Sequence, residues 1–237
     1  MDKTLFGNCS RPEFVGCTLL DTIGLYLPSV DPALRCAAQI PEEIKSVGIL
    51  SSRTGAAGQI LACDDAAKQT GVRPVSIELP RDTKGWGGHG CFLLLGGKTP
   101  SETRRAVELA LEGIEKNAGE VHISDAGHLE FAYSASAGSV LNAAFGVPEG
   151  APFGFCAASP AAIGFVLSDG ILKEHSVSLL HYLSPDYGTR HSNEVITIFT
   201  GETADVKSAV LDAKERGFSL LRAMGSEPKS PAEPYLI

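Results

Sequence analysis

Short apolar runs separated by polar, glycine-rich connections recur along the whole chain. Val47–Ser51 and Phe153–Ala157 are two such runs, and each has glycine at its second position. Val75–Leu79 alternates apolar and polar residues with a period of two, which is typical of a half-buried strand. Longer segments with helical spacing lie between these runs. The pattern predicts an α/β (α+β) protein made of short strands and amphipathic helices.

The second half of the chain repeats the first at a spacing of 103 to 106 residues. The run Phe92–Thr99 matches Ile196–Thr203. Each half also places an acid four residues before a lysine: Asp64 with Lys68, and Asp169 with Lys173. Because this register holds over many segments, we interpret the chain as a tandem duplication.

The repeat divides the chain into two domains with two short flanking segments. We expect an N-terminal extension over 1–12, repeat domains over 13–118 and 119–225, and an extended, proline-containing tail over 226–237. Each domain is predicted to follow the order β-α-β-α-β-β-α, which suits a mixed sheet flanked by helices. The expected strands are 14–20, 46–51, 75–79 and 91–95, then 129–133, 152–157, 177–183 and 194–199, and the later helices are 137–145, 160–174 and 203–216.

Capping residues predict where several of the helices begin and end. Asp31 precedes Pro32, and Thr99 precedes Pro100 with Glu102 at the third helical position. Both patterns are typical of helix N-termini. Gly71 follows the helix expected over 55–70 and is a suitable C-terminal cap.

Charge and composition exclude several classes of function. The 237 residues carry a net charge of −8, so no basic surface is available to neutralise nucleic-acid phosphates. No apolar stretch approaches the roughly 20 residues that a membrane-spanning helix needs. The first residues contain no apolar core of a secretion signal, and the six cysteines include no closely spaced pair. We therefore expect reduced thiols, no membrane association and a cytoplasmic location.

Motifs for catalysis or cofactor binding fail on inspection. Gly97-Lys98-Thr99 has Phe92 where a phosphate loop needs its first glycine. The glycines of 85–90 precede a strand, whereas a dinucleotide fingerprint opens a helix. His122 and His128 are close enough in sequence to share a ligand, but polar residues near a repeat junction are the simpler interpretation. With no metal-binding spacing and no nucleophile elbow, we predict no enzyme activity, no metal and no cofactor.

Two loops at corresponding positions of the repeat, 80–90 and 184–193, carry the most unusual composition. Their polar residues, glycines and aromatic residues are Arg81, Asp82, Lys84, Gly85, Trp86, Gly87, Gly88, His89, Asp186, Tyr187, Arg190, His191 and Asn193. Ordinary solvated loops would account for this composition equally well. The Asp64–Lys68 and Asp169–Lys173 pairs also have a simple interpretation as pairs that stabilise a helix surface.

The residues resemble a known family, that of bacterial microcompartment shell domains. The run SVGILSSRTGAAGQILACDDAAKQTGVRPVSIELPRDTKG contains the strand with its glycine, the helix with Asp-x-x-x-Lys and the following strand and loop. The segments EFVGCTLLDTIGLYLPSVDPALRCA and LRAMGSEP resemble the tandem-domain shell proteins of the propanediol- and ethanol-utilisation type. In these proteins each domain is circularly permuted, so that a strand and helix, here 14–38, come first.

The resemblance implies a structural role without catalysis. It implies that three chains form a pseudohexagonal tile, and that tiles pack edge to edge with other shell proteins through Lys68 and Lys173. Loops 80–90 and 184–193 match the pore loop, through which small polar metabolites such as alcohols, polyols and aldehydes would pass. The N-terminal extension is a candidate contact for encapsulated enzymes. Neither loop contains cysteine, so the iron–sulfur site of some relatives is not expected.

The charges of the two loops predict a selectivity for the pore. Arg81, Lys84 and Arg190 outnumber Asp82 and Asp186 by one positive charge, which would favour small anions and tolerate neutral solutes. The glycines make loop 80–90 the expected gate, with Trp86 as its bulky element, although packing of Trp86 as a core anchor at the subunit boundary is an equal alternative. Two other functions stay open at this point: a metabolite-binding regulatory trimer, and an enzyme that uses His89 or His191 as a general base.

Overall fold

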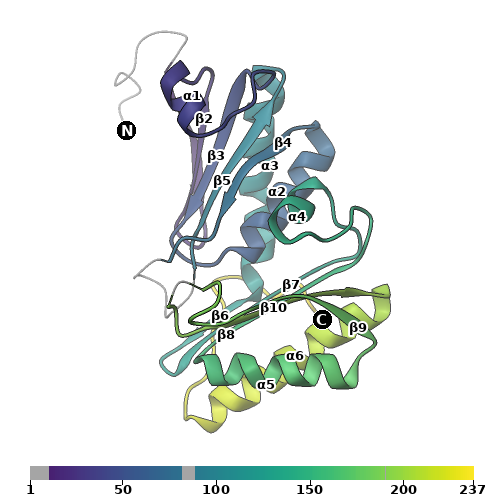
Figure 1. The fold of residues 1–237 in the computed structure, drawn as a ribbon. Helices are drawn as coiled ribbons and strands as arrows, with labels where there is room; N and C mark the ends of the chain where they lie inside the picture. Colours follow the sequence, from purple (N-terminus) through teal and green to yellow (C-terminus); the bar gives the residue numbers. More distant parts are fainter. Residues whose placement is uncertain (1–10, 82–88, 190) are drawn as a thin grey trace.

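The computed structural model describes residues 11–81, 89–189 and 191–237. It consists of two five-stranded sheets, each accompanied by three helices (Figure 1). The first sheet has the order β1-β2-β3-β5-β4 and the second has the order β6-β7-β8-β10-β9. The two orders are the same, which fits the duplication read from the sequence.

The first half of the chain builds the first sheet from residues 13 to 97. Its strands are β1 (Glu13–Thr18), β2 (Thr22–Leu27), β3 (Ser46–Ser52), β4 (Arg73–Glu78) and β5 (Cys91–Gly97). Its helices are α1 (Pro32–Ala37), α2 (Ala57–Thr70) and α3 (Pro100–Asn117). Helix α3 packs on the sheet and α2 packs against α3, whereas no residue of α1 is buried.

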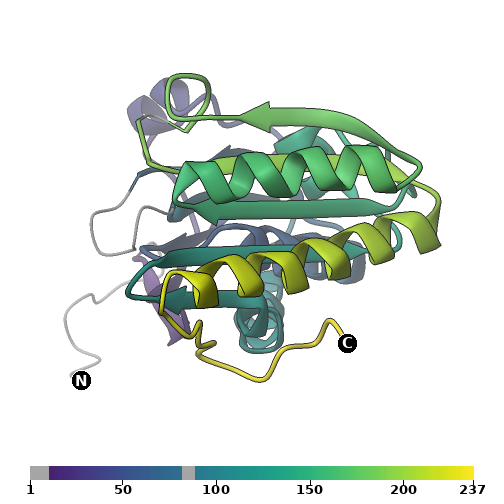
Figure 2. The same cartoon turned by 90° about the horizontal axis from the view of Figure 1, so that it is seen from below.

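The second half repeats this arrangement after a short 3-10 turn, Ala118–Glu120. Its strands are β6 (Val121–Ser124), β7 (Gly127–Ser134), β8 (Phe153–Ser159), β9 (Val177–Leu183) and β10 (Val195–Gly201). Its helices are α4 (Ser139–Phe145), α5 (Ala161–Glu174) and α6 (Thr203–Ala223). Helices α5 and α6 lie side by side on the second sheet (Figure 2).

Two details of the predicted fold are wrong. The sheets are not mixed, because every pair of neighbouring strands in them is antiparallel. Each half also begins with a hairpin where one strand was predicted. The turn of the first hairpin passes through Leu20 and Asp21, both with positive φ, at 60° and 54°. Leu20-Asp21 lacks the Asn-Gly or Asp-Gly pair that signals such a turn, and leucine rarely adopts positive φ.

The helix ends of the first half follow the capping predictions. The side chain of Asp31 accepts hydrogen bonds from the N–H groups of Ala33 and Leu34, and the Thr99 hydroxyl accepts one from Glu102. Gly71 adopts the left-handed conformation expected of a C-terminal cap, with φ of 74°. Thr203 does not cap its helix, and α6 continues to Ala223, beyond the predicted end at 216.

One large hydrophobic cluster contains residues from both halves of the chain. Helix α4 belongs to the second half but lies beside α2 of the first (Figure 1). Leu141 and Phe145 of α4 join the buried cluster that contains Ile60 of α2. We call this α2–α4 contact the intrachain seam. The apolar area buried there couples the folding of the two halves.

The C-terminal tail returns to the body of the protein as an extended segment (Figure 2). Lys229 pairs with Ile123 at the edge of the second sheet. Glu120 accepts a hydrogen bond from the N–H of Leu236 at 2.7 Å, and the Lys214 ammonium donates one to the carbonyl of Leu236 at 2.9 Å. The tail is therefore extended, as predicted, but it is firmly docked.

Candidate functional site

The two loops predicted as pore loops occupy equivalent places in the fold. One connects β4 to β5, and the other connects β9 to β10. Several of the predicted pore residues lie outside the described part of the chain. These are Asp82, Lys84, Gly85, Trp86, Gly87, Gly88 and Arg190.

The described loop residues fall into two groups. Tyr187, Asp186 and His191 are exposed, and Nδ1 of His191 lies 3.5 Å from a carboxylate oxygen of Asp186. Arg81 is exposed too, and its backbone pairs with that of His89 at the base of the first loop. Asn193 forms the second group. Its side chain accepts a hydrogen bond from the N–H of Ala161 and so caps α5.

His89 is buried and does not extend into solvent. Its Nδ1 lies 2.5 Å from one carboxylate oxygen of Glu194, and Nε2 of His128 lies 2.8 Å from the other. Glu194 directly precedes β10, so this carboxylate joins the ends of both loops. Burial opposes ionisation of Glu194, but the hydrogen bonds from His128 and His89 outweigh it and lower the pKa of the carboxyl group below its usual value.

Glu130 lies on β7 close to this cluster and has the opposite electrostatic character. One of its oxygens accepts the N–H groups of Ala56 and Ala57 at 2.9 and 2.7 Å, so it caps the N-terminus of α2 from the other half of the chain. Burial raises the pKa of Glu130, and the negative charge of Glu194 raises it further. The junction between the halves thus holds two carboxyl groups whose pKa values move apart.

Asp64 supplies a second cap across the intrachain seam. Its carboxylate accepts the N–H groups of Gly138, Val140 and Leu141 at 2.8 to 3.0 Å. The side chain is fully buried and pairs with Lys68, whose ammonium also donates to the carbonyl of Ser136 at 2.7 Å. Lys68, predicted as a tile-edge residue, is therefore held by groups of its own chain.

Lys173, the second predicted edge residue, is much more accessible. Its side chain is 72% exposed and its ammonium pairs with Asp169 at 2.8 Å, four residues earlier on α5. The side chain of Lys68, by comparison, is 37% exposed. The two lysines occupy matching places in the repeat but differ in what already binds them.

A second buried cluster anchors the C-terminal tail. Glu120 pairs with Lys214 at 2.9 Å, and Nε2 of His122 lies 3.6 Å away from it. Burial works against ionisation of Glu120, but His122, the N–H of Leu236 and Lys214 together lower its pKa. His122 also meets the ring of Phe218 edge-on. His122 and His128 therefore belong to separate clusters and share no ligand.

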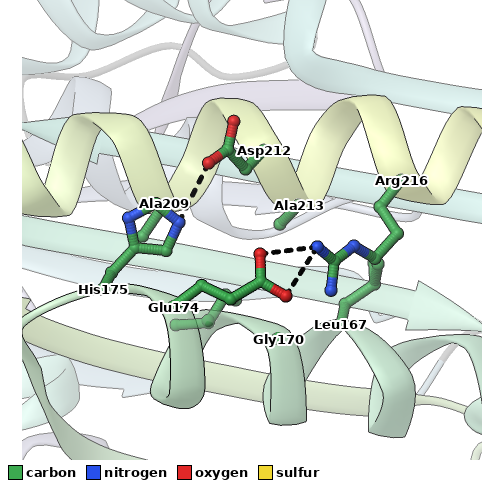
Figure 3. Close-up of a pocket in the computed structure, with 9 residues that line it drawn as sticks. Leu167, Gly170, Glu174, His175, Ala209, Asp212, Ala213 and Arg216 are labelled. Atoms are coloured by element: carbon green, nitrogen blue, oxygen red, sulfur yellow. Dashed lines mark hydrogen bonds and ion pairs between the residues drawn. The ribbon is translucent and has the colours of Figure 1, made fainter.

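A small pocket lies between α5 and α6 (Figure 3). Arg216 binds both carboxylate oxygens of Glu174, and His175 lies 3.0 Å from Asp212. Its other lining residues are small or aliphatic: Leu167, Gly170, Ile171, Ala209 and Ala213. No hydroxyl or thiol lines this pocket, so the His–Asp pair has no nucleophile to activate.

Other functional chemistry is limited in the described part of the chain. Residues 11–81, 89–189 and 191–237 contain no group of three or more histidine, cysteine or acidic side chains placed to hold a metal ion. Among these residues, no helix is long and apolar enough to cross a membrane. Cys63, Cys91 and Cys156 are buried free thiols, and burial raises the pKa of Cys91 to about 12. Such thiols are unreactive near neutral pH.

The sequence interpretation missed Glu130 and Glu194. One signal was available, because His128 and Glu130 alternate with apolar residues and must share one face of a strand. Nothing in the local sequence indicated that this face would be covered by the first half of the chain.

Comparisons with known proteins agree with the fold. A family model for the BMC domain matches residues 153–226. The chain is 42% identical over 229 residues to the bacterial microcompartment shell protein PduB of Citrobacter freundii, an alignment that covers 97% of this chain and 85% of that protein.

Two solved structures are also similar over nearly their full length. A trimeric bacterial microcompartment shell protein PduB has a TM-score of 0.90 at 39% identity, covering 95% of this chain and 100% of that one. EtuB from Clostridium kluyveri has a TM-score of 0.91 at 41% identity, covering 94% and 97%. The same tandem fold, strand order and near full-length similarity lead to one conclusion. The chain belongs to the family of PduB-type bacterial microcompartment shell proteins.

Proposed function

We propose that three copies of this chain form a tile of a microcompartment shell, and that the tile has a structural role without catalysis. The similarity to a trimeric PduB structure over nearly the whole chain carries this proposal. Two domains of one fold joined head to tail supply six domains when three chains close a ring. The expected particle in solution therefore has the mass of three 24.8-kDa chains.

Light scattering coupled to gel filtration tests this assembly. A trimer at micromolar concentration supports the proposal, and a monomer or dimer contradicts it. The alternative of a metabolite-binding regulatory trimer predicts the same mass, so a second measurement separates the two. Electron microscopy of concentrated protein should reveal flat sheets or tubes if the trimer is a shell tile.

The paired loops are proposed to line the route for small polar metabolites. Their support is positional: both connect the last two strands of their sheets, and the ends of the two loops meet where Glu194 pairs with His89. Exposed side chains at Tyr187 and His191 are available to line an opening.

The flux of a small neutral polyol through reconstituted tiles tests the pore and the gate. If Trp86 obstructs the opening, Trp86→Gly should raise the flux. Phe14→Gly is the matched control, because Phe14 is an exposed aromatic residue outside the loops. Unchanged flux through an intact trimer would remove Trp86 from the gate.

Assembly with other shell proteins and with encapsulated enzymes completes the proposed role. We place the edge contacts at Lys68 and Lys173 and the enzyme contact in the N-terminal extension, 1–12. Deletion of residues 2–12 should leave the trimer intact and reduce co-purification of cargo enzymes with assembled shells. Equal cargo recovery from the deletion variant would contradict the role of the extension.

A further inference from the structure

The C-terminal tail lies along the second half of the protein with alternate side chains turned toward it. From 226 to 236 the even-numbered residues are half-buried or buried, whereas the odd-numbered residues from 225 to 233 are exposed. A period of two is that of an extended strand lying on a surface. The inward residues are small or apolar: Ser226, Pro228, Ser230, Ala232, Pro234 and Leu236. The tail is therefore held as an extended peptide is held.

The tail covers a sheet edge that the second repeat leaves incomplete. Strand β6 pairs with only the first half of β7, whereas β1 pairs with β2 as far as Tyr26. Tyr133 of β7 corresponds to Tyr26, because both lie opposite the glycine that the two repeats share. Where Tyr26 is covered by β1, Tyr133 donates its N–H to the hydroxyl of Tyr235 at 3.3 Å. The tail thus takes the place that β1 occupies in the first half.

A buried ion pair binds the backbone of one tail residue. Glu120 accepts the N–H of Leu236 at 2.7 Å, and Lys214 donates to the carbonyl of Leu236 at 2.9 Å. The side chains of Glu120 and Lys214 are 0% and 8% exposed and lie 2.9 Å apart. Together they offer the acceptor and the donor that a neighbouring strand would offer. Main-chain hydrogen bonds supply the affinity when a peptide is recognised by strand addition.

The surface under the tail also restricts which peptide can lie there. Leu236 is 4% exposed and packs into the core of the second half. At Gly119 the two backbones lie so close that a Cβ would be 2.1 Å from the carbonyl oxygen of Glu233. Ser230 donates to the carbonyl of Gly119 at 2.9 Å. A pocket for one side chain and a close backbone approach give such a site its specificity.

The bound tail contacts both halves of the chain. Tyr235 packs against the large cluster shared by the halves and against the core of the second half. The ammonium of Lys116, near the end of α3, lies 5.9 Å from the centre of the Tyr235 ring. Ala232 packs against the cluster that holds Leu20 of the first half and Val121 of the second. A peptide bound here therefore holds the two halves together.

We propose that the 3-10 turn, β6, β7 and α6 form a recognition site for an extended peptide, and that residues 226–237 are its resident ligand. The ligand class is an extended peptide with small side chains at alternate positions and a leucine two residues after a proline. Prolines at 228, 231 and 234 reduce the conformational freedom that binding must remove. The inference goes beyond the proposed tile and does not depend on it.

Release of the tail by a protease tests the site. A cleavage sequence is placed between Gly225 and Ser226, next to the turn in which Gly225 has a φ of 80°, and the folded full chain is cut. We expect the cut tail to stay bound during gel filtration. A fluorescently labelled peptide of residues 226–237, added in excess, should then exchange into the site, and fluorescence anisotropy measures its affinity. A labelled peptide of the same residues in scrambled order should not bind.

Two adjacent substitutions in the peptide provide a matched comparison. Leu236 is buried in the complex, whereas Ile237 is 93% exposed. The Leu236→Ala peptide should bind about tenfold or more weakly, because it leaves a packed site empty. The Ile237→Ala peptide should bind like the unmodified one. Equal affinities of the two variant peptides, or no exchange of the unmodified peptide, would overturn the proposal. A cut chain that unfolds would also overturn it, because the tail would then be part of the core and no ligand.

Gly119→Ala tests the same site without cleavage. Gly119 lies in the 3-10 turn, where the backbone conformation suits alanine, but the added Cβ would meet the carbonyl of Glu233. In hydrogen exchange on the uncut wild type, the protection factor of the Leu236 amide should exceed that of Ile237 by about tenfold or more. Gly119→Ala should remove this protection and leave the amides of β8 unchanged.

The hydrogen-exchange results decide the proposal independently of the trimer. A wild-type Leu236 amide that exchanges as freely as that of Ile237 would overturn it, and so would protection of Leu236 that persists in Gly119→Ala. Either result leaves the proposed tile intact, because light scattering measures the assembly separately.

Discussion

The Asp64 carboxylate accepts the backbone N–H of Gly138 at 2.8 Å, although 74 residues separate them along the chain. Gly138 stands at the N-cap position of α4 and has no side chain with which to cap the helix. A residue of the first half therefore satisfies the helix end of the second half. The orphan N–H groups at a helix start need such an acceptor when they are buried.

Loss of this cap should destabilise the chain markedly. Asp64→Ala removes three hydrogen bonds from a buried carboxylate and leaves the N–H groups of α4 without an acceptor. We expect the free energy of unfolding to fall by about 2 to 3 kcal/mol, measured by urea denaturation. Asp169→Ala is the matched control, because Asp169 is exposed and pairs only with Lys173 among the described contacts. Similar losses for both variants would contradict the seam-capping role.

The paired carboxyl groups at the junction predict opposite responses to pH. The pKa of Glu194 lies below its unfolded value of about 4.3. Its stabilising contribution is therefore fully present above about pH 4.3 and is lost as the pH falls through the folded-state pKa. Urea unfolding of the wild type and Glu194→Gln should show a stability difference that shrinks as the solution is acidified. A difference that is constant from pH 7 to pH 3 would contradict this.

Glu130 should behave in the reverse sense. Its pKa is raised in the folded state, so the wild type loses stability as the pH rises from about 4.3 through the raised value. Glu130→Gln keeps an oxygen acceptor for Ala56 and Ala57 but does not ionise. The free energy of unfolding of the variant, relative to that of the wild type, should therefore increase across this interval and stay constant above it. If the variant instead becomes less stable relative to the wild type as the pH rises, ionised Glu130 is net stabilising.

The sequence predicted the repeat, most of the helices and the strands from local signals. Asp31, Thr99 and Gly71 act within their own helices, so their neighbours in sequence are enough to identify them. Asp64 illustrates the limit. Its spacing to Lys68 reads as a surface pair, and the same spacing at Asp169 is indeed a surface pair. Only the packing of α4 on α2 buries one of the two, and no local pattern encodes that contact.

The C-terminal residues offer a direct comparison of a docked and a free side chain. Leu236 is buried in the core of the second half, whereas the adjacent Ile237 is 93% exposed. Leu236→Ala should lower the free energy of unfolding by about 2 kcal/mol or more, because it empties a packed site. Ile237→Ala should change it by less than about 0.5 kcal/mol. Thermal unfolding by calorimetry measures both, and equal effects would show that the tail is not docked in solution.

The matched lysines allow a tile-edge role to be separated from a role in stability. The pair of Lys173 with Asp169 adds little to the stability of the chain, because an exposed i,i+4 pair contributes about 0.3 to 0.5 kcal/mol. Lys173→Ala should therefore melt like the wild type and stay trimeric, yet form fewer sheets if Lys173 contacts neighbouring tiles. Lys68→Ala leaves the buried Asp64 without its cation and should lower stability as well. Electron microscopy measures sheet formation by each variant, and gel filtration of the same samples shows whether the trimer is retained. If a variant that carries both Lys68→Ala and Lys173→Ala stays trimeric and still forms normal sheets, neither lysine lies at the tile edge.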